Sequence, residues 1–146
     1  SVGYPDRAAS LQVLAGSANP DRAKGLRPII ATHAVAEMAD MVKTNYVNDA
    51  VLDYVQRLVE ATRADADTTL GVSTRGAIAM VRAVRVWAAA HGRNYAVPDD
   101  VKQLAAPTWT HRLVMSPEAE FSGATATQVI ARALDNVEPP KERQGQ

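Results

Sequence analysis

Hydrophobic residues recur along this chain at spacings of three and four, which is the pattern of helices with one buried face. Predicted helices begin near Arg7, at Thr32 or His33, after Asn48 and Asp49, after Ser73 or Thr74, at Pro98, and at Ala124. Short segments rich in glycine, proline, asparagine or aspartate separate them. We therefore expect an all-α fold, a small bundle of about five or six helices with at most short extended pieces.

The apolar residues of each predicted helix are expected to share a face and to form one core. The first helix follows Asp6 as its N-cap, ends at Gly16, and carries an apolar face of its own. Asn48 and Asp49 form a capping pair, and His91 with Gly92 ends the helix that starts after Ser73 or Thr74. The predicted core positions of the later helices, in chain order, are Val35, Met38, Ala39 and Val42; Val51, Leu52, Val55, Leu58, Val59 and Thr62; Ile78, Val81, Val84 and Trp87 or Ala88; Val101, Leu104 and Ala105; and Val129, Ile130 and Ala133.

The connecting segments have their own predicted character. A polar linker punctuated by Asn19 and Pro20 is expected to be the most mobile loop. Two short extended pieces are predicted at residues 68–71 and 95–97, and a loop is predicted at residues 115–123. The last helix is expected to run from Ala124 to Leu134, and the polar segment 138–146 is expected to be disordered.

Composition narrows the classes of function. Sixteen basic and sixteen acidic residues give a formal net charge of zero, so no overall field attracts nucleic acid or anionic lipid. The absence of cysteine excludes disulfides and thiolate chemistry, and is compatible with a reducing compartment, so we expect the cytoplasm. The longest apolar runs are far shorter than the roughly 18–20 residues of a membrane span, so we expect none.

Common catalytic motifs are missing from the sequence. It has no phosphate-binding G-x-x-x-x-G-K-[ST] loop and no H-E-x-x-H pair. No two of the three histidines have helical ligand spacing, so no metal site is predicted. Paired carboxylates such as Asp99 and Asp100 are typical of helix caps. Nothing here forms a complete reaction centre.

A stripe of arginines is more informative. Arg75, Arg82 and Arg85 are seven and ten residues apart on one predicted helix, so they fall within one sector of its surface. The stripe is either a solvated face opposite the core or a contact with the phosphates of a nucleotide or a nucleic acid. Arg75 stands out because the first turn of a helix adds free N–H groups beside its guanidinium.

Four separated motifs resemble the C-terminal lid of the MoxR family of AAA+ ATPases. They occur in the family's order and span most of the chain: Thr62 and Arg63, Leu70 through Arg75, Ala88 through Val101, and His111 through Leu113. Gly3, Tyr4 and Pro5 resemble the point where the family's ATPase core meets its lid. The resemblance divides the chain into a hinge remnant of the core at 1–5, a helical lid at 6–137 and a tail at 138–146.

The resemblance also implies roles for individual residues. Arg75 matches the sensor-2 arginine, which reaches the γ-phosphate of ATP that the core binds with Mg. Tyr4 and Pro5 match the hinge near the adenine. Arg93 and Arg112 are expected to be structural. The roles of Arg82 and Arg85 stay open.

The same resemblance implies partners. They are the upstream AAA+ core, neighbouring subunits of a hexameric ring, and client proteins that the intact ATPase remodels as a chaperone. The P-loop would lie upstream, so we expect this chain to be a fragment that neither hydrolyses ATP nor binds it tightly alone. The alternative is a helical protein-interaction module that binds a partner through the arginine stripe without nucleotide. Nucleic-acid binding is the weakest interpretation.

Overall fold

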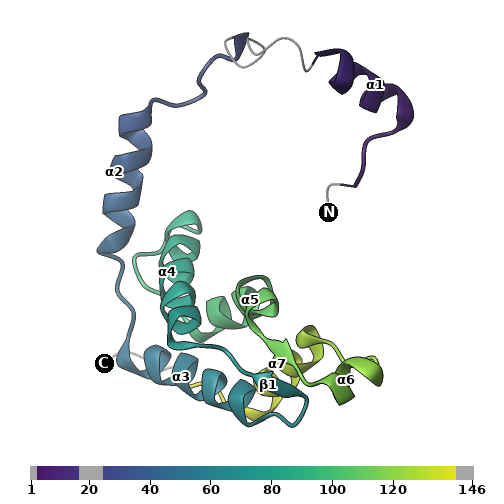
Figure 1. Cartoon of the computed structure of the whole chain (residues 1–146). Helices are drawn as coiled ribbons and strands as arrows, with labels where there is room; N and C mark the ends of the chain where they lie inside the picture. The colour runs from purple at the N-terminus through teal and green to yellow at the C-terminus, as the bar shows by residue number, and fades with distance from the viewer. Residues whose placement is uncertain (1–2, 17–24, 141–146) are drawn as a thin grey trace. The chain divides into compact units, whose positions relative to one another are not determined.

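The structure, a computed structural model, describes residues 3–16 and 25–140 (Figure 1). Asn19, Pro20 and the tail 141–146 lie outside these residues, so the predictions made for them stay untested. The chain forms two units, Ser1–Ala36 and Glu37–Gln146. The predicted division at 1–5, 6–137 and 138–146 stays a prediction.

Two helices precede the core of the second unit. Helix α1 (Arg7–Gly16) has the predicted cap, because the backbone N–H of Ala9 donates to Asp6 Oδ1 at 2.7 Å. Helix α2 (Thr32–Lys43) is also confirmed, but its predicted buried face is wrong. Val35 is 51% exposed and Met38 54% exposed, and no residue of α2 is buried. Regular spacing determines which side chains share a face, but not whether the chain itself covers that face.

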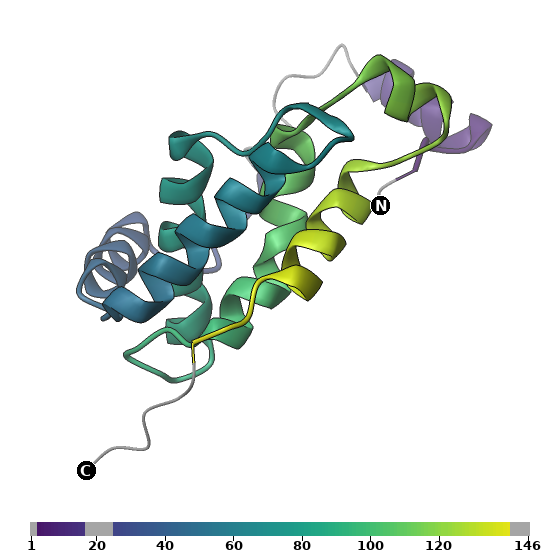
Figure 2. The same cartoon turned by 90° about the horizontal axis from the view of Figure 1, so that it is seen from below.

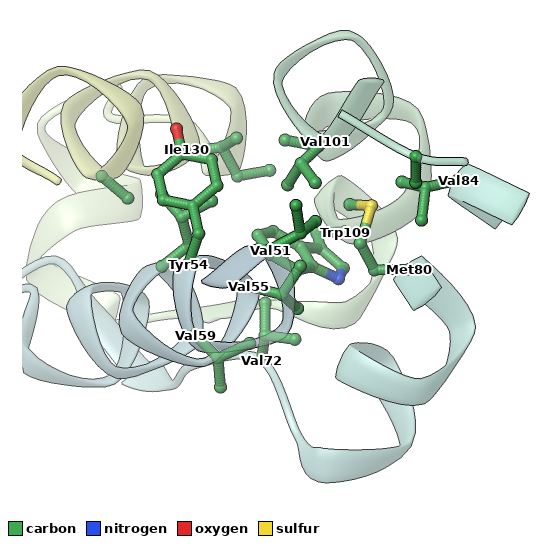
Figure 3. Packing of buried hydrophobic residues seen from close by; sticks show 14 of the residues in the cluster. Val51, Tyr54, Val55, Val59, Val72, Met80, Val84, Val101, Trp109 and Ile130 are labelled. Atoms are coloured by element: carbon green, nitrogen blue, oxygen red, sulfur yellow. The ribbon is translucent and has the colours of Figure 1, made fainter. Parts of the chain in front are cut away.

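Four helices of the second unit pack pairwise around one core. These are α3 (Asp49–Ala64), α4 (Thr74–Ala90), α5 (Pro98–Trp109) and α7 (Ala126–Asn136). Helix α4 stands across α3 in Figure 1, and α7 runs beside α3 in Figure 2. Trp109 of α5 lies within the cluster, close to the valines of α3 and Met80 of α4 (Figure 3).

Helix starts follow the predicted caps. Asn48 accepts a hydrogen bond from the backbone N–H of Ala50 at 2.8 Å, and Ser73 accepts one from Gly76 at 3.3 Å. Helix α4 ends at Ala90 with His91 as its C-cap, followed by Gly92 with φ of +70°. Helix α7 begins after Thr125, two residues later than predicted, and the predicted core residues Val129, Ile130 and Ala133 are buried. The predicted core positions of α5 are also buried or half-buried.

The predicted faces of α3 and α4 need correction. Leu52 is 39% exposed and Ile78 is 49% exposed, whereas Tyr54 and Met80 are fully buried. Both helices carry apolar residues over more than half their circumference. In such helices the positions of neighbouring helices decide which apolar side chains are buried.

One segment has more structure than expected. Residues 115–123 were predicted to be a loop, but Val114–Met115 form strand β2 and Pro117–Phe121 form helix α6. Strand β2 pairs antiparallel with β1 (Thr68–Leu70), which is the first predicted extended piece. Ser116 caps α6 by accepting from the N–H of Ala119. A 3-10 turn, η2 (Thr110–Arg112), joins α5 to β2.

The predicted all-α class is confirmed. Within residues 3–16 and 25–140 the structure has seven α-helices and one two-stranded sheet. None of the helices in this part of the chain has the length and hydrophobicity needed to cross a bilayer.

Candidate functional site

The loop that leads from β1 into α4 is fixed by the end of α3. The backbone N–H of Val72 donates to Thr62 Oγ1 at 3.0 Å, and the carbonyl of Val72 accepts from Arg63 Nε at 2.9 Å. Gly71 lies against the backbone of Arg63, where an added Cβ would be 2.6 Å from Arg63 Cα. The side chain of Val72 is fully buried. Residues 62–63 and 71–72, two of the sequence motifs, therefore form one packed junction.

The first turn of α4 is fixed from the other side by α5. The indole N–H of Trp109 donates to the carbonyl of Gly76 at 3.0 Å, in a buried position. A Cβ on Gly76 would be 2.6 Å from Val72 Cγ1 and 3.4 Å from Arg112 Cδ. Arg112 donates from Nε to the carbonyl of Thr108 at 3.1 Å, as expected for a structural arginine at a helix end. The glycine at position 76 lets Val72, Trp109 and Arg112 approach the same backbone turn.

Arg75 is held by this anchored backbone, but its own side chain is exposed. It lies in the first turn of α4, directly before Gly76. Among the described residues, no hydrogen bond or ion pair involves its guanidinium. The partial positive charge of the helix start adds to that of the side chain. The arrangement presents a positively charged side chain to solvent from a backbone that is held in place.

Arg82 and Arg85 lie further along α4 and differ from each other. Arg82 is exposed, whereas Arg85 is half-buried. The backbone carbonyl of Arg85 accepts a hydrogen bond from Asn45 Nδ2 at 3.0 Å. Its side-chain Nε is buried without a hydrogen-bond partner among the described residues.

The loop after the C-terminal end of α4 carries Arg93, whose guanidinium, unlike that of Arg75, is paired inside the fold. Arg93 donates from Nη1 and Nη2 to the two carboxylate oxygens of Asp100, at 2.9 and 2.6 Å. It also donates to the carbonyl of Tyr95. Burial alone would raise the pKa of the Asp100 carboxyl, but hydrogen bonds from Arg93 and from the N–H of Val97 outweigh it and lower that pKa. Arg93 therefore joins the end of α4 to the start of α5, which fits its predicted structural role.

Comparison with known proteins shows the family to which this fold belongs. Residues 60–133, about half of the chain, match the family model described as the AAA lid domain. The chain belongs to the AAA lid domain family. The lid's matched part runs from the end of α3 through the anchored loop, α4 and α5 into α7.

Relatives place the lid among those of MoxR-type AAA+ ATPases, which confirms the resemblance. "Chaperone MoxR1" of Mycobacterium tuberculosis is 28% identical over 97% of this chain and 39% of its own length. "Protein MoxR" of Paracoccus denitrificans is 32% identical over 66% of this chain and 32% of its own length. Protein YeaC of Bacillus subtilis, which is uncharacterized, is 32% identical over 97% of this chain and 44% of its own length.

A solved structure agrees with these relatives. The crystal structure of a candidate ATPase from Cytophaga hutchinsonii superposes on the lid with a TM-score of 0.76 at 27% identity. The match covers 96% of this chain and 45% of that one. The chain spans less than half the length of each of these relatives.

The three predicted site residues belong to different units. Tyr4 and Pro5 precede α1 in the unit Ser1–Ala36, and the side chain of Tyr4 is fully exposed. Arg75 lies in the unit Glu37–Gln146.

One cluster that shapes the lid is not indicated by any pattern in the sequence. Arg132 of α7 binds Asp65 through two hydrogen bonds, at 2.7 and 3.0 Å, and binds Asp67 at 2.6 Å. The hydrogen bonds from Arg132 lower the pKa of the Asp65 carboxyl against the opposing effect of burial. The cluster holds α7 against the turn between α3 and β1. Asp65 and Asp67 precede Arg132 by 67 and 65 residues in the sequence, so no local pattern indicates the pairing.

Proposed function

We propose that this lid supplies Arg75 as the sensor-2 arginine to ATP that an AAA+ core binds with Mg. The observation that carries the proposal is the contrast at Arg75 itself: an exposed guanidinium without an internal partner stands on a backbone turn that α3 and α5 hold. A structural arginine is recognised by the bonds that its side chain makes inside the fold, and the side chain of Arg75 makes none with the described residues. The match to lids of AAA+ ATPases supports a nucleotide phosphate as the ligand that we propose for this arginine.

The chemistry of Arg75 fits a terminal phosphate. Its planar guanidinium binds phosphate oxygens through charge-assisted hydrogen bonds, and the start of α4 favours negative charge at the same place. Mg neutralises part of the phosphate charge when it is bound. Contact with the γ-phosphate exists before hydrolysis and is lost afterwards, so the nucleotide state determines whether Arg75 is attached to the core.

The anchored loop connects that contact to the body of the lid. Val72 is hydrogen bonded to Thr62 and Arg63 at the end of α3, and Gly76 is hydrogen bonded to Trp109 of α5. A displacement of Arg75 by the phosphate therefore moves the start of α4 together with α3 and α5. The lid turns as one body instead of yielding locally. This is how the hydrolysis step becomes a change in the angle between lid and core.

The remaining parts of the proposal concern the whole ATPase. Tyr4 and Pro5 form the hinge and lie near the adenine. The ATPase forms a hexameric ring in the cytoplasm and remodels client protein complexes as a chaperone. The name of the related protein "Chaperone MoxR1" supports the chaperone part of this proposal. The lid by itself neither hydrolyses ATP nor binds it tightly.

The decisive experiment replaces Arg75 in a protein that joins this lid to its AAA+ core. Arg75→Ala is expected to lower ATP turnover at least about tenfold, since loss of one charged group that contacts the reacting phosphates commonly costs more than that. Lys102→Ala is the control, because it removes an exposed positive charge on α5 that pairs with Asp99, and it should leave turnover within about twofold. Circular dichroism should show unchanged helix content for both variants. Equal turnover of Arg75→Ala and the unaltered protein would refute the proposal.

A further inference from the structure

A groove between α3 and α4 begins one turn beyond Arg75. Its volume is about 240 Å³, and its walls are formed by Leu52, Val55 and Gln56 of α3 and by Ala77, Ile78, Val81, Arg82 and Arg85 of α4. Leu52 and Ile78 are the residues of α3 and α4 that were predicted to be buried but are substantially exposed. Both side chains are exposed because they line this groove, which stays open to solvent between α3 and α4.

The groove is positively charged along one side. Arg82 and Arg85 line it on the α4 side, and no acidic residue is part of its lining. The nearby acids of α3 have other partners: Asp53 accepts from Arg57 at 2.8 Å, and Glu60 accepts from Gln56 at 2.8 Å. The buried Nε of Arg85 has no acceptor within the described part of the chain. A buried N–H without an acceptor is costly, so this atom favours a ligand that supplies one.

The size and chemistry of the groove select the class of ligand. A volume of about 240 Å³ is below the roughly 300–1,000 Å³ typical of small-molecule pockets, but it accommodates apolar anchor side chains. Phosphate groups alone would leave Leu52, Ile78 and Val81 in water. Apolar anchors would cover Leu52, Ile78 and Val81, which form the floor of the groove, and carboxylates would pair with the two arginines. A helix presents both kinds of side chain together at spacings of three and four residues.

We propose that this groove docks an amphipathic helix of another polypeptide, with aliphatic anchors on the floor and carboxylates that pair with Arg82 and Arg85. Charge complementarity identifies the occupant as acidic. The surface is separate from Arg75 and does not involve nucleotide, so it goes beyond the sensor-2 role. Because both features lie on α4, the docked helix touches the same rigid element that Arg75 moves.

The test uses the full chain and a labelled helical peptide with leucines in one row and two glutamates flanking that row. Fluorescence anisotropy should show saturable binding with one peptide per chain. Arg82→Glu combined with Arg85→Glu should weaken binding at least tenfold, and a peptide with lysines in place of the glutamates should recover affinity for this variant. Ile78→Ser should weaken binding as well. Lys102→Glu is the matched control, since it reverses an exposed charge on α5, and it should change the affinity less than twofold.

Three outcomes would overturn the proposal. The first is absence of saturable binding, or binding that both arginine substitutions leave unchanged. The second is salt-dependent binding of a DNA or RNA oligonucleotide that competes with the peptide, which would assign the groove to nucleic acid. The third is a concentration-dependent dimer, detected by sedimentation and abolished by the same substitutions, which would show that a second copy of the chain fills the groove.

Discussion

An arginine lies at each end of helix α4, Arg75 in its first turn and Arg93 in the loop that follows its last residue, and the chain uses the two in opposite ways. At the C-terminal end Arg93 is paired with both oxygens of Asp100, whose side chain is 5% exposed. At the N-terminal end Arg75 is exposed, while the backbone around it is fixed by Thr62, Arg63 and Trp109. The same residue type therefore stabilises the fold at one end and leaves its charge available at the other.

This difference shows how a binding group is recognised in a fold that contains no complete site. Arg93 donates three hydrogen bonds inside the chain, two of them to the Asp100 carboxylate, so its charge is already paired within the fold. Around Arg75 the contacts belong to the backbone, and the guanidinium gains nothing from the fold. Substitutions at the two ends should separate stability from function.

The largest loss of stability is expected from Arg93→Ala. This change leaves the Asp100 carboxylate buried without its partner, and breaking such pairs costs about 3 kcal/mol. Urea unfolding followed by circular dichroism measures the change in the free energy of unfolding. Lys102→Ala, which breaks the exposed pair with Asp99, is the control and should cost less than about 0.5 kcal/mol. Equal costs for the two variants would contradict the structural role of Arg93.

A smaller loss of stability is expected from Gly71→Ala, in the loop before the N-terminal end of α4. The new methyl group would meet the backbone of Arg63 at 2.6 Å, and backbone cannot move aside as a side chain does. We expect a cost of about 2 kcal/mol, typical of overpacking. Gly92→Ala should cost only about 1 kcal/mol, because Gly92 has a positive φ but no atom in the way. Thermal unfolding of both variants tests the order.

The stabilisation that the Arg93–Asp100 pair provides should depend on pH. The pKa of the Asp100 carboxyl is lower in the folded lid than the ordinary value of about 3.9. Its contribution is thus fully present above that ordinary value and is lost as pH falls through the folded pKa. Asp100→Asn should therefore be less stable than the unaltered protein at pH 7, with a difference that shrinks below about pH 4. A difference that stays constant down to pH 2.5 would show that the carboxylate charge is not the cause.

The smallest effect on stability is expected from Arg75→Ala. Its side chain is exposed and bonds to no other described residue, so the free energy of unfolding should change by less than about 0.5 kcal/mol. Urea unfolding of this variant and of Arg93→Ala in parallel gives the direct contrast. A cost near that of Arg93→Ala would mean that Arg75 supports the fold.

Local signals explain which parts of the lid were predictable. Asn48, Ser73 and Pro98 begin helices through contacts within a few residues, and the expected helices are present there. Helix α6 was missed although Ser116 and Pro117 carry a usable start signal, because five residues leave too little periodicity to detect. Strand β2 was missed because its partner β1 lies more than forty residues earlier.

The surroundings of Arg75 illustrate what a sequence cannot show directly. Its position at a helix start followed from the two candidate caps, Ser73 and Thr74. The need for glycine at 71 and 76 depends on Arg63, Val72 and Trp109 packing on the same turn, and these contacts form only when α3, α4 and α5 meet. The groove beside Arg82 depends in the same way on how far α3 stands from α4. The roles of Arg75, Tyr4 and Pro5 toward nucleotide stay predictions.

Trp109 gives the lid an optical reporter of its own. The chain has two tryptophans, and Trp109 is 1% exposed with its indole N–H bound to the carbonyl next to Arg75. Replacing Trp87 with phenylalanine would leave a protein whose tryptophan emission comes from Trp109 alone. Any partner that displaces the start of α4 would then change the emission wavelength or intensity of Trp109, without a dye or a label attached to the chain.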